Sequence, residues 1–287
     1  MLLFKIWKML LLQLVMLNIA TSREWNGSSW GAGGDMEASM SSMSVAGTLS
    51  SAIYFGGYDD TSGVASYSSR SEIYNGTSWS DATSMRHNMM GSGTGRSTTD
   101  AIMCSGSTTT GSNNTGVSEE LDGTTWSAGG TRNTATSVGG AVGGITDCIT
   151  MSGYAFAASN ETVACESYNG TAWSAENDIG IASRYASSWG TGTTGAWYYG
   201  GINYQSAYGN PTPHVVDRTP EYWNGTTWAD DTQSPDAGGT SGGRYNTNVS
   251  AATVSNTGTQ GAMIMGGHSY TVPDTHAKLS TVWEANW

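Results

Sequence analysis

Apolar residues in this chain gather into short runs that end in glycine, and these runs recur. In each run a small residue and three mostly apolar or aromatic residues lead into a pair of small residues. The copies span 52–57, 101–106, 148–153, 196–201 and 262–267. Such a run closed by glycine is typical of a strand buried on both faces. A weaker segment rich in Ser, Thr, Gly, Val and Ala precedes each run, and we expect it to form the innermost strand.

A second string alternates with the first and ends in tryptophan. Its copies end at Trp30, Trp79, Trp126, Trp173 and Trp228, and a degenerate sixth copy ends at Trp287. The spacings are 49, 47, 47, 55 and 59 residues, and a period of this size indicates a propeller or solenoid with one supersecondary unit per repeat. Most copies contain Asn-Gly between two β-prone segments, which predicts a hairpin with a type I′ turn and positive φ at both central residues.

The two strings together predict a four-stranded unit: an inner strand, a glycine-pair strand, an aromatic strand and a tryptophan strand. This order resembles the kelch repeat, and the resemblance covers residues 23–287. It implies an all-β propeller of four-stranded antiparallel blades. The blades are expected at 36–80, 85–127, 132–174, 183–229 and 244–287. With its Asn-Gly-Thr turn, the repeat is closest to kelch-like propellers of marine phage and marine microbial sequences, which resemble virion or cell-surface appendages.

Closure of the ring follows from a mismatch between the strings. There are five glycine-pair strings but six hairpin strings, and a propeller avoids open sheet edges. We therefore expect residues 28–33 to supply the outermost strand of the fifth blade. The competing possibility is that the N-terminal hairpin docks on another subunit and builds a fibre.

Composition supports the β assignment. The chain has 40 glycines among 287 residues and only 12% charged residues, about twice the glycine and half the charge of an average protein. After the first 17 residues the only leucines are Leu49, Leu121 and Leu279. A helical bundle and a doubly wound α/β enzyme are therefore excluded.

The leucine-rich start predicts a secretory signal peptide over residues 1–22. Lys5 and Lys8 precede an apolar run, and small residues follow at Ala20-Thr21-Ser22. A membrane anchor is the alternative, but the run is shorter than the roughly 20 residues that a spanning helix needs. Cleavage would remove two lysines and move the net charge from −12 to −14. We expect a secreted, extracellular-surface or virion-associated protein with no nucleic-acid partner and no stable membrane insertion.

Arginine follows the tryptophan strand in four of the five repeats, and this places a candidate ligand site at one mouth of the central channel. The arginines are Arg86, Arg132, Arg184 and Arg244, and His87, Tyr185 and Tyr245 stand beside three of them. Guanidinium groups bind carboxylate and phosphate in bidentate fashion, which indicates an anion or an acidic sugar. The alternative, which we favour, is structural: the arginines pair with glutamates that precede the aromatic strand, namely Glu72, Glu119, Glu166 and Glu221.

Other candidates are weaker. The four histidines show no metal-ligand spacing, and the carboxylate pairs Asp59-Asp60 and Asp230-Asp231 could hold calcium but lie in segments expected to be solvated. We expect no cofactor, no metal and no catalytic residue. Exposed aromatic residues in loop tips such as 154–156 could stack on sugars, although packing is the commoner role. The long loops at 203–218 and 230–243 are the best positions for binding.

The three cysteines are few for a secreted chain. Cys148 lies on a glycine-pair strand and Cys165 on the strand that follows it, so a hairpin centred near residues 156–157 would place them opposite one another as a candidate disulfide. Cys104 is expected to be a buried free thiol.

These observations favour a non-catalytic recognition or adhesion module that binds cell-surface glycans or a protein partner. One alternative is a structural fibre or scaffold subunit that self-assembles. Another is a carbohydrate oxidase or glycosidase built on the same scaffold. Fold alone does not decide among them.

Overall fold

The computed structural model describes residues 20–25, 29–59, 66–108, 114–201, 203 and 220–230. It also gives the backbone of residues 9–11, 250–253, 261–265, 268–271, 275–278 and 282–286. All regular elements in these segments are β-strands, arranged in antiparallel sheets, and no helix occurs among them. The all-β class expected from the composition is confirmed.

Four sheets repeat one plan and are named units I to IV here. Each contains an inner strand, a glycine-pair strand, an aromatic strand and a tryptophan strand, hydrogen-bonded in that order. Unit I contains β5 (Ser44–Thr48), β6 (Ser51–Phe55), β9 (Ser71–Tyr74) and β10 (Trp79–Asp81). Unit II contains β11 (Met90–Ser97), β12 (Asp100–Ser107), β14 (Val117–Leu121) and β15 (Trp126–Thr131), with β13 (Asn114–Thr115) beside β12.

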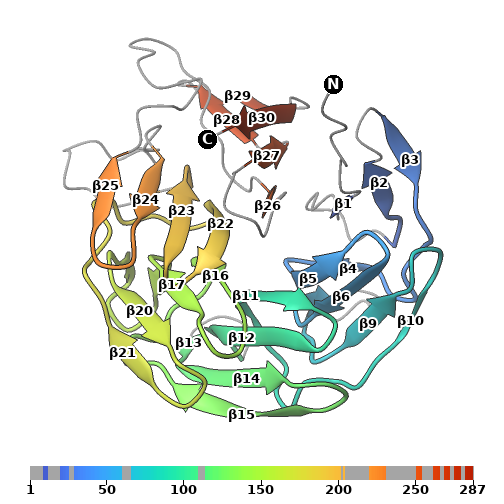
Figure 1. The fold of residues 1–287 in the computed structure, drawn as a ribbon, viewed down its shortest axis with the longest axis horizontal. Coiled ribbons are helices and arrows are strands. Elements are labelled where there is room, and N and C mark those ends of the chain that lie inside the picture. The colour runs from blue at the N-terminus through green and yellow to red at the C-terminus, as the bar shows by residue number, and fades with distance from the viewer. Residues whose placement is uncertain are drawn as a thin grey trace, which may run out of the picture.

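Unit III contains β16 (Gly140–Val142), β17 (Ile149–Met151), β20 (Cys165–Tyr168) and β21 (Trp173–Ala175). Unit IV contains β22 (Ser187–Gly192), β23 (Gly195–Tyr199), β24 (Glu221–Trp223) and β25 (Trp228–Asp230). A further three-stranded sheet contains β26 (Ser250–Thr253), β27 (Gly261–Met265) and β30 (Val282–Asn286). In Figure 1 these sheets follow one another around an arc in chain order, with the inner strands toward the middle.

Small additional sheets extend the ends of the glycine-pair strands. In unit I, β4 (Met40–Ser41) pairs with β7 (Tyr58–Asp59), which pairs with β8 (Ser66–Tyr67). In unit III, β18 (Tyr154–Ala155) pairs with β19 (Asn160–Glu161), and Tyr154 also bridges to Ser137. A corresponding hairpin of β28 (His268–Thr271) and β29 (Thr275–Lys278) follows β27.

The N-terminal hairpin pairs locally. β2 (Arg23–Trp25) pairs with β3 (Trp30–Ala32) on one side and with β1 (Met9–Leu11) on the other. Closure of the last sheet by residues 28–33 stays a prediction; within the described backbone β3 pairs with β2 and β30 pairs with β27.

Glycine pairs end the second strand because the chain there approaches its neighbours closely. Gly57 has φ of 103°, and a Cβ on it would lie 2.6 Å from the carbonyl oxygen of Ser41. Gly153 has φ of 105° and an equivalent contact of 2.9 Å to the Ser137 carbonyl. The N–H groups of both glycines donate to carbonyls of the next unit, at Met89 and Ser183, over 2.9 Å. These glycines therefore join consecutive units through the backbone.

The Asn-Gly turns differ from the expected two-residue type. The register pairs Tyr74 with Trp79, so four residues lie between the strands. Gly76 has positive φ, whereas the Asn75 side chain accepts hydrogen bonds from the N–H groups of Thr77 at 2.9 Å and Ser78 at 3.0 Å. The turns at Asn169 and Asn224 have the same geometry. The type I′ prediction was wrong because the asparagine closes the turn with its side chain rather than with a left-handed backbone.

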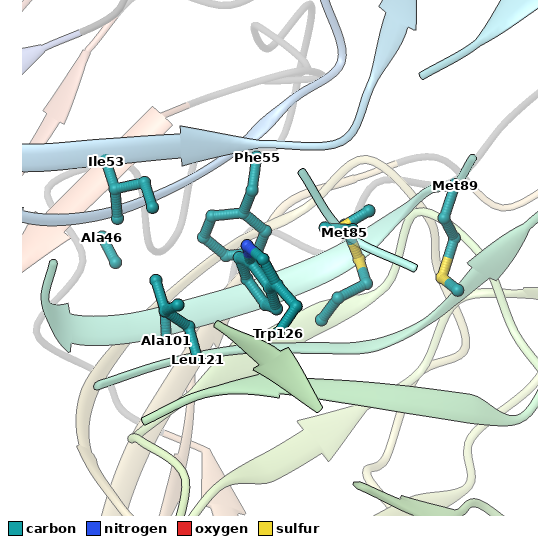
Figure 2. Packing of buried hydrophobic residues seen from close by; sticks show 9 residues of the cluster. Ala46, Ile53, Phe55, Met85, Met89, Ala101, Leu121 and Trp126 are labelled. Atoms are coloured by element: carbon teal, nitrogen blue, oxygen red, sulfur yellow. The ribbon is translucent and has the colours of Figure 1, made fainter. Parts of the chain in front are cut away.

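The buried hydrophobic residues form several separate clusters, and clusters lie where neighbouring units meet. In the junction of units I and II, the ring centroids of Phe55 and Trp126 lie 4.9 Å apart. Met85 lies beside these rings, and Met89 lies beyond Met85 in the same cluster (Figure 2). Phe55 and Met89 are fully buried. Units I and II therefore stack through apolar faces, and such burial is consistent with the low charge content of the chain.

Candidate binding site

Buried glutamates of the aromatic strands bind the chain segment that enters their own unit. We call Glu72, Glu119, Glu166 and Glu221 the repeat glutamates, and each is at most 5% exposed. Each accepts two successive main-chain N–H groups over 2.6–3.2 Å. The donors are Glu37 and Ala38, Arg86 and His87, Asn133 and Thr134, and Gly180 and Ile181, respectively. A buried carboxylate in each unit is thus satisfied by the linker backbone.

These donors show that the predicted arginines do not occupy one structural position. Arg86 is itself one of the donors, Arg132 precedes the donor Asn133, and Arg184 follows the donor Ile181 by three residues. In the sequence these arginines share only their place after the tryptophan strand. A single ring of equivalent arginines is therefore not what the described units contain.

The environments of these arginines differ accordingly. Arg86 is exposed, and its neighbour His87 places Nδ1 2.6 Å from Glu119 Oε1. The Arg132 side chain is 1% exposed, and its Nε lies 3.5 Å from Glu166 Oε1. Arg184 instead places Nε 3.2 Å from Oε1 of Glu161, which is not a repeat glutamate. Arg244 and Tyr245 lie outside the described residues, as do most of the two long loops proposed for binding.

Arg132 is a structural residue. Its Nη1 donates to Ser105 Oγ at 2.8 Å and to Thr136 Oγ1 at 2.9 Å, and its guanidinium lies 5.6 Å from the Trp173 ring centroid. Burial lowers the pKa of Arg132, and the nearby Glu166 carboxylate opposes this. Because the guanidinium is enclosed in protein, it is not available to a ligand.

Arg184 lies in a group of aromatic residues that is partly open to solvent. Its guanidinium carbon lies 4.6 Å from the Tyr154 ring centroid and 5.6 Å from that of Tyr185. The Tyr154 and Phe156 rings meet edge to face at 4.7 Å. The Arg184 side chain is 20% exposed, and the three aromatic residues are half-buried. We call Tyr154, Phe156, Glu161, Arg184 and Tyr185 the aromatic–arginine cluster.

Two units build this cluster, and main-chain contacts fix it. Tyr154 and Glu161 face each other across the β18–β19 hairpin of unit III, whereas Arg184 and Tyr185 belong to the linker that enters unit IV. The Tyr185 N–H donates to the Val138 carbonyl at 2.8 Å. Tyr185 has φ of 59°, a conformation that costs a bulky residue about 1 kcal/mol or more. The hairpin and the linker together hold the cluster in place.

The sequence identified part of this cluster. Arg184 and Tyr185 were predicted ligand-binding residues, and Tyr154 to Phe156 were noted as an aromatic loop tip. The sequence did not identify Glu161 as a site residue, because Glu161 does not stand out against the repeat pattern. Its position opposite Tyr154 depends on a short hairpin that carries no Asn-Gly signal.

The cysteines do not form the predicted pair. The register of β17 and β20 places Met151 opposite Cys165, whereas Cys148 lies one residue before β17. The Cys148 sulfur lies 3.4 Å from that of Cys104 in unit II, and all three cysteines are free and buried. The expected Cys148–Cys165 opposition is wrong because the connection between these strands contains the β18–β19 hairpin and is not symmetrical about residues 156–157.

Two other features bear on sites. Within the described segments, no group of three or more His, Cys, Asp or Glu side chains is placed to hold a metal ion. Those segments also contain no helix of the length and apolarity that crossing a membrane requires.

Comparison with known proteins shows similarity of fold alone. No protein-family model and no curated protein matches the sequence. Among solved structures, one reported as the structure of YjhT aligns with a TM-score of 0.70 at 12% identity, covering 93% of this chain and 91% of that one. This likeness extends over nearly the whole of both chains, so the succession of antiparallel sheets has a counterpart in a solved protein.

Proposed function

We propose that this protein is a kelch-like β-propeller that acts as a non-catalytic recognition module and binds cell-surface glycans at the aromatic–arginine cluster. In this proposal units I to IV are blades, and the protein works outside the cell or on a virion surface. The repeated strand order and the likeness in fold to a solved structure support the propeller architecture.

The observation that carries the binding proposal is the stacking of Arg184 on Tyr154 beside Phe156 and Tyr185. Aromatic faces offer apolar area at low conformational entropy, and they pack on the carbon face of a sugar ring. A guanidinium offers several fixed donors to hydroxyl or carboxylate oxygens. The buried Glu161 carboxylate holds Arg184 in position from the protein side.

The rigidity of the cluster also favours binding. The Gly153 N–H donates to the Ser183 carbonyl at 2.9 Å, and Ser152 Oγ donates to the same carbonyl at 2.6 Å. The chain on both sides of Tyr154 and Arg184 is thereby fixed before a ligand arrives, which reduces the ordering cost of binding.

A glycan array with a matched pair of variants tests this function. Tyr154 and Tyr58 both follow the pair of small residues that ends a glycine-pair run, and both pair with a serine of the linker, Ser137 and Ser41 respectively. Tyr154→Ala is expected to weaken binding at least tenfold, while Tyr58→Ala leaves it unchanged. Arg184→Gln is expected to weaken the binding of acidic glycans more than the binding of neutral ones. A blank array with the wild-type protein, or equal losses in the two tyrosine variants, would contradict the proposal.

A further inference from the structure

The contact between units II and III carries a cysteine pair that the other described contacts lack. Cys104 and Cys148 are both fully buried, and their sulfurs are 3.4 Å apart. Cys104 is the fourth residue of the run 101–106, and Cys148 is the first residue of the run 148–153. The corresponding pairs are Phe55 with Ala101 and Met151 with Ala196. Only between units II and III does the repeat place two thiols face to face.

The surroundings of this pair are also exceptional. At the position of Arg132, the other units have Met36, Met85 and Ile179, all buried and apolar. The Arg132 atoms Nε and Nη2 are buried and have no hydrogen-bond partner among the described residues. The interior of this contact therefore contains a buried guanidinium where the other described units have an apolar side chain.

We propose that Cys104 and Cys148 are a modification site at which an interblade disulfide forms when the chain folds in the presence of a small-molecule disulfide. One thiolate attacks that disulfide, forms a mixed disulfide and releases the first small thiol. The other cysteine sulfur then attacks the mixed disulfide, so that the Cys104–Cys148 bond forms and the second small thiol leaves. The two protons of the cysteine thiols end on the two released thiols, and the small-molecule disulfide is the species reduced.

Burial determines when this exchange takes place. Both side chains are enclosed once units II and III have packed, and burial raises the pKa of the Cys148 thiol well above its ordinary value. Exchange therefore belongs to the folding chain, before the junction closes. Once formed, the bond is enclosed between the units and protected from reductants in solution.

The bond would link two consecutive units and shorten the unfolded chain. It encloses the segment from Cys104 to Cys148, so its stabilisation comes mainly from the reduced entropy of the unfolded state. For a chain of this size we expect the Tm to rise by about 5–10 °C relative to the reduced protein.

The experiment compares full-length protein refolded with oxidised and reduced glutathione against protein refolded with dithiothreitol. After denaturation, the glutathione sample should have one reactive thiol and the dithiothreitol sample three. Tryptic digestion should join peptide 97–132 to peptide 133–184 in the oxidised sample. Cys165 lies in the same peptide as Cys148, so the link between the peptides could come from either cysteine. The variant Cys165→Ser separates these two cases and is expected to keep both the link and the rise in Tm.

Cys148→Ala is the decisive variant. It installs the residue that other units have at this position, Ala101 and Ala196, and we therefore expect it to fold. It should lose both the peptide link and the oxidant-dependent rise in Tm. Three reactive thiols in the oxidised wild type, a link within peptide 133–184 alone, or a link that survives Cys148→Ala would each overturn the proposal.

Discussion

The junction of units I and II and the junction of units II and III have the same architecture but different interiors. The first contains Phe55, Met85 and Met89 around Trp126 and is apolar throughout (Figure 2). At the corresponding positions the second has Cys104, Arg132 and Thr136 around Trp173. Gly56 and Ala101 of the first are replaced by Ser105 and Cys148 in the second. The backbone of the repeat therefore accepts either an apolar or a hydrogen-bonded interior.

The difference shows how an ion is accommodated in a repeated core. Arg132 is accompanied by hydroxyl groups at two positions where the first junction has Gly56 and Met89, and by the carboxylate of Glu166. That carboxylate already occurs in every described unit because it binds the linker backbone. A buried charge is tolerable only with such partners. The polar interior therefore depends on a set of coordinated replacements.

The largest effect is expected from placing arginine in the apolar junction. Met85→Arg puts a guanidinium beside Gly56 and Met89, which offer no side-chain hydroxyl. We expect a loss of about 4 kcal/mol in the free energy of unfolding, measured by urea denaturation. The double variant Met85→Arg with Met89→Thr should recover part of this loss. Equal stability of Met85→Arg and wild type would show that the hydroxyl groups are unnecessary.

Removing the carboxylate charge of the repeat glutamate is expected to lower the free energy of unfolding by different amounts in the two junctions. Glu166→Gln leaves the buried Arg132 without its counter-charge and should cost about 3 kcal/mol. Glu119→Gln retains an acceptor for the Arg86 and His87 N–H groups and should cost about 1–2 kcal/mol. Both values are obtained from chemical denaturation under one set of conditions. A loss at Glu119 as large as that at Glu166 would contradict a special role for the Arg132 pair.

A smaller effect is expected from converting the polar junction to the apolar pattern. Arg132→Met installs the residue type that the junction of units I and II has at this position, Met85. Glu166 retains its hydrogen bonds from Asn133 and Thr134. We expect a change of less than about 1.5 kcal/mol in either direction. Arg132→Ala, which leaves a cavity, is the control and should be clearly less stable. Thermal melts of both variants separate loss of volume from loss of charge.

The smallest effect concerns a tyrosine present in only one of these junctions. Tyr168 donates to Glu120 of unit II, whereas the corresponding residue of the first junction is Leu121. Burial and this hydrogen bond raise the pKa of Tyr168 from 10.0 to about 12. A phenol whose pKa is higher in the folded state stabilises the fold below pH 10, and this contribution disappears as the pH rises toward 12.

Tyr168→Phe should therefore be less stable than wild type at neutral pH and should lose less stability between pH 10 and pH 12. Thermal melts across that range measure the difference. Leu121→Met, at the equivalent apolar position, is the control and should follow the wild-type pH profile. A parallel decline of wild type and Tyr168→Phe would show that Tyr168 is not the titrating group.

The sequence predicted the repeated elements well and their side-chain partners poorly. The glycine pairs and tryptophan strings predicted the strand order of units I to IV because backbone geometry restricts those residue types. The expected pairing of the repeat glutamates with arginines holds for Glu166 and Arg132. The main-chain N–H groups that all four glutamates bind were not predicted, because such a donor is present at nearly every residue and leaves no mark in the sequence. Similarly, the neighbour of Cys148 could not be predicted, since it depends on which face of β12 meets the next unit.

The candidate site was predictable only in part for the same reason. Arg184 and Tyr185 stood out because they depart from the repeat. Their association with Tyr154 and Glu161 depends on contact between a hairpin of one unit and the linker of the next. Such contacts between units have no periodic signature.

The repeat glutamates also have a consequence for how this architecture can change over evolutionary time. Each of them, together with the backbone it binds, lies within one stretch of about 35–42 residues, from linker to aromatic strand. A gene duplication that begins at a linker would therefore copy both the acceptor and its donors. A new module made in this way arrives with its own attachment, so the number of modules can grow or shrink by whole steps.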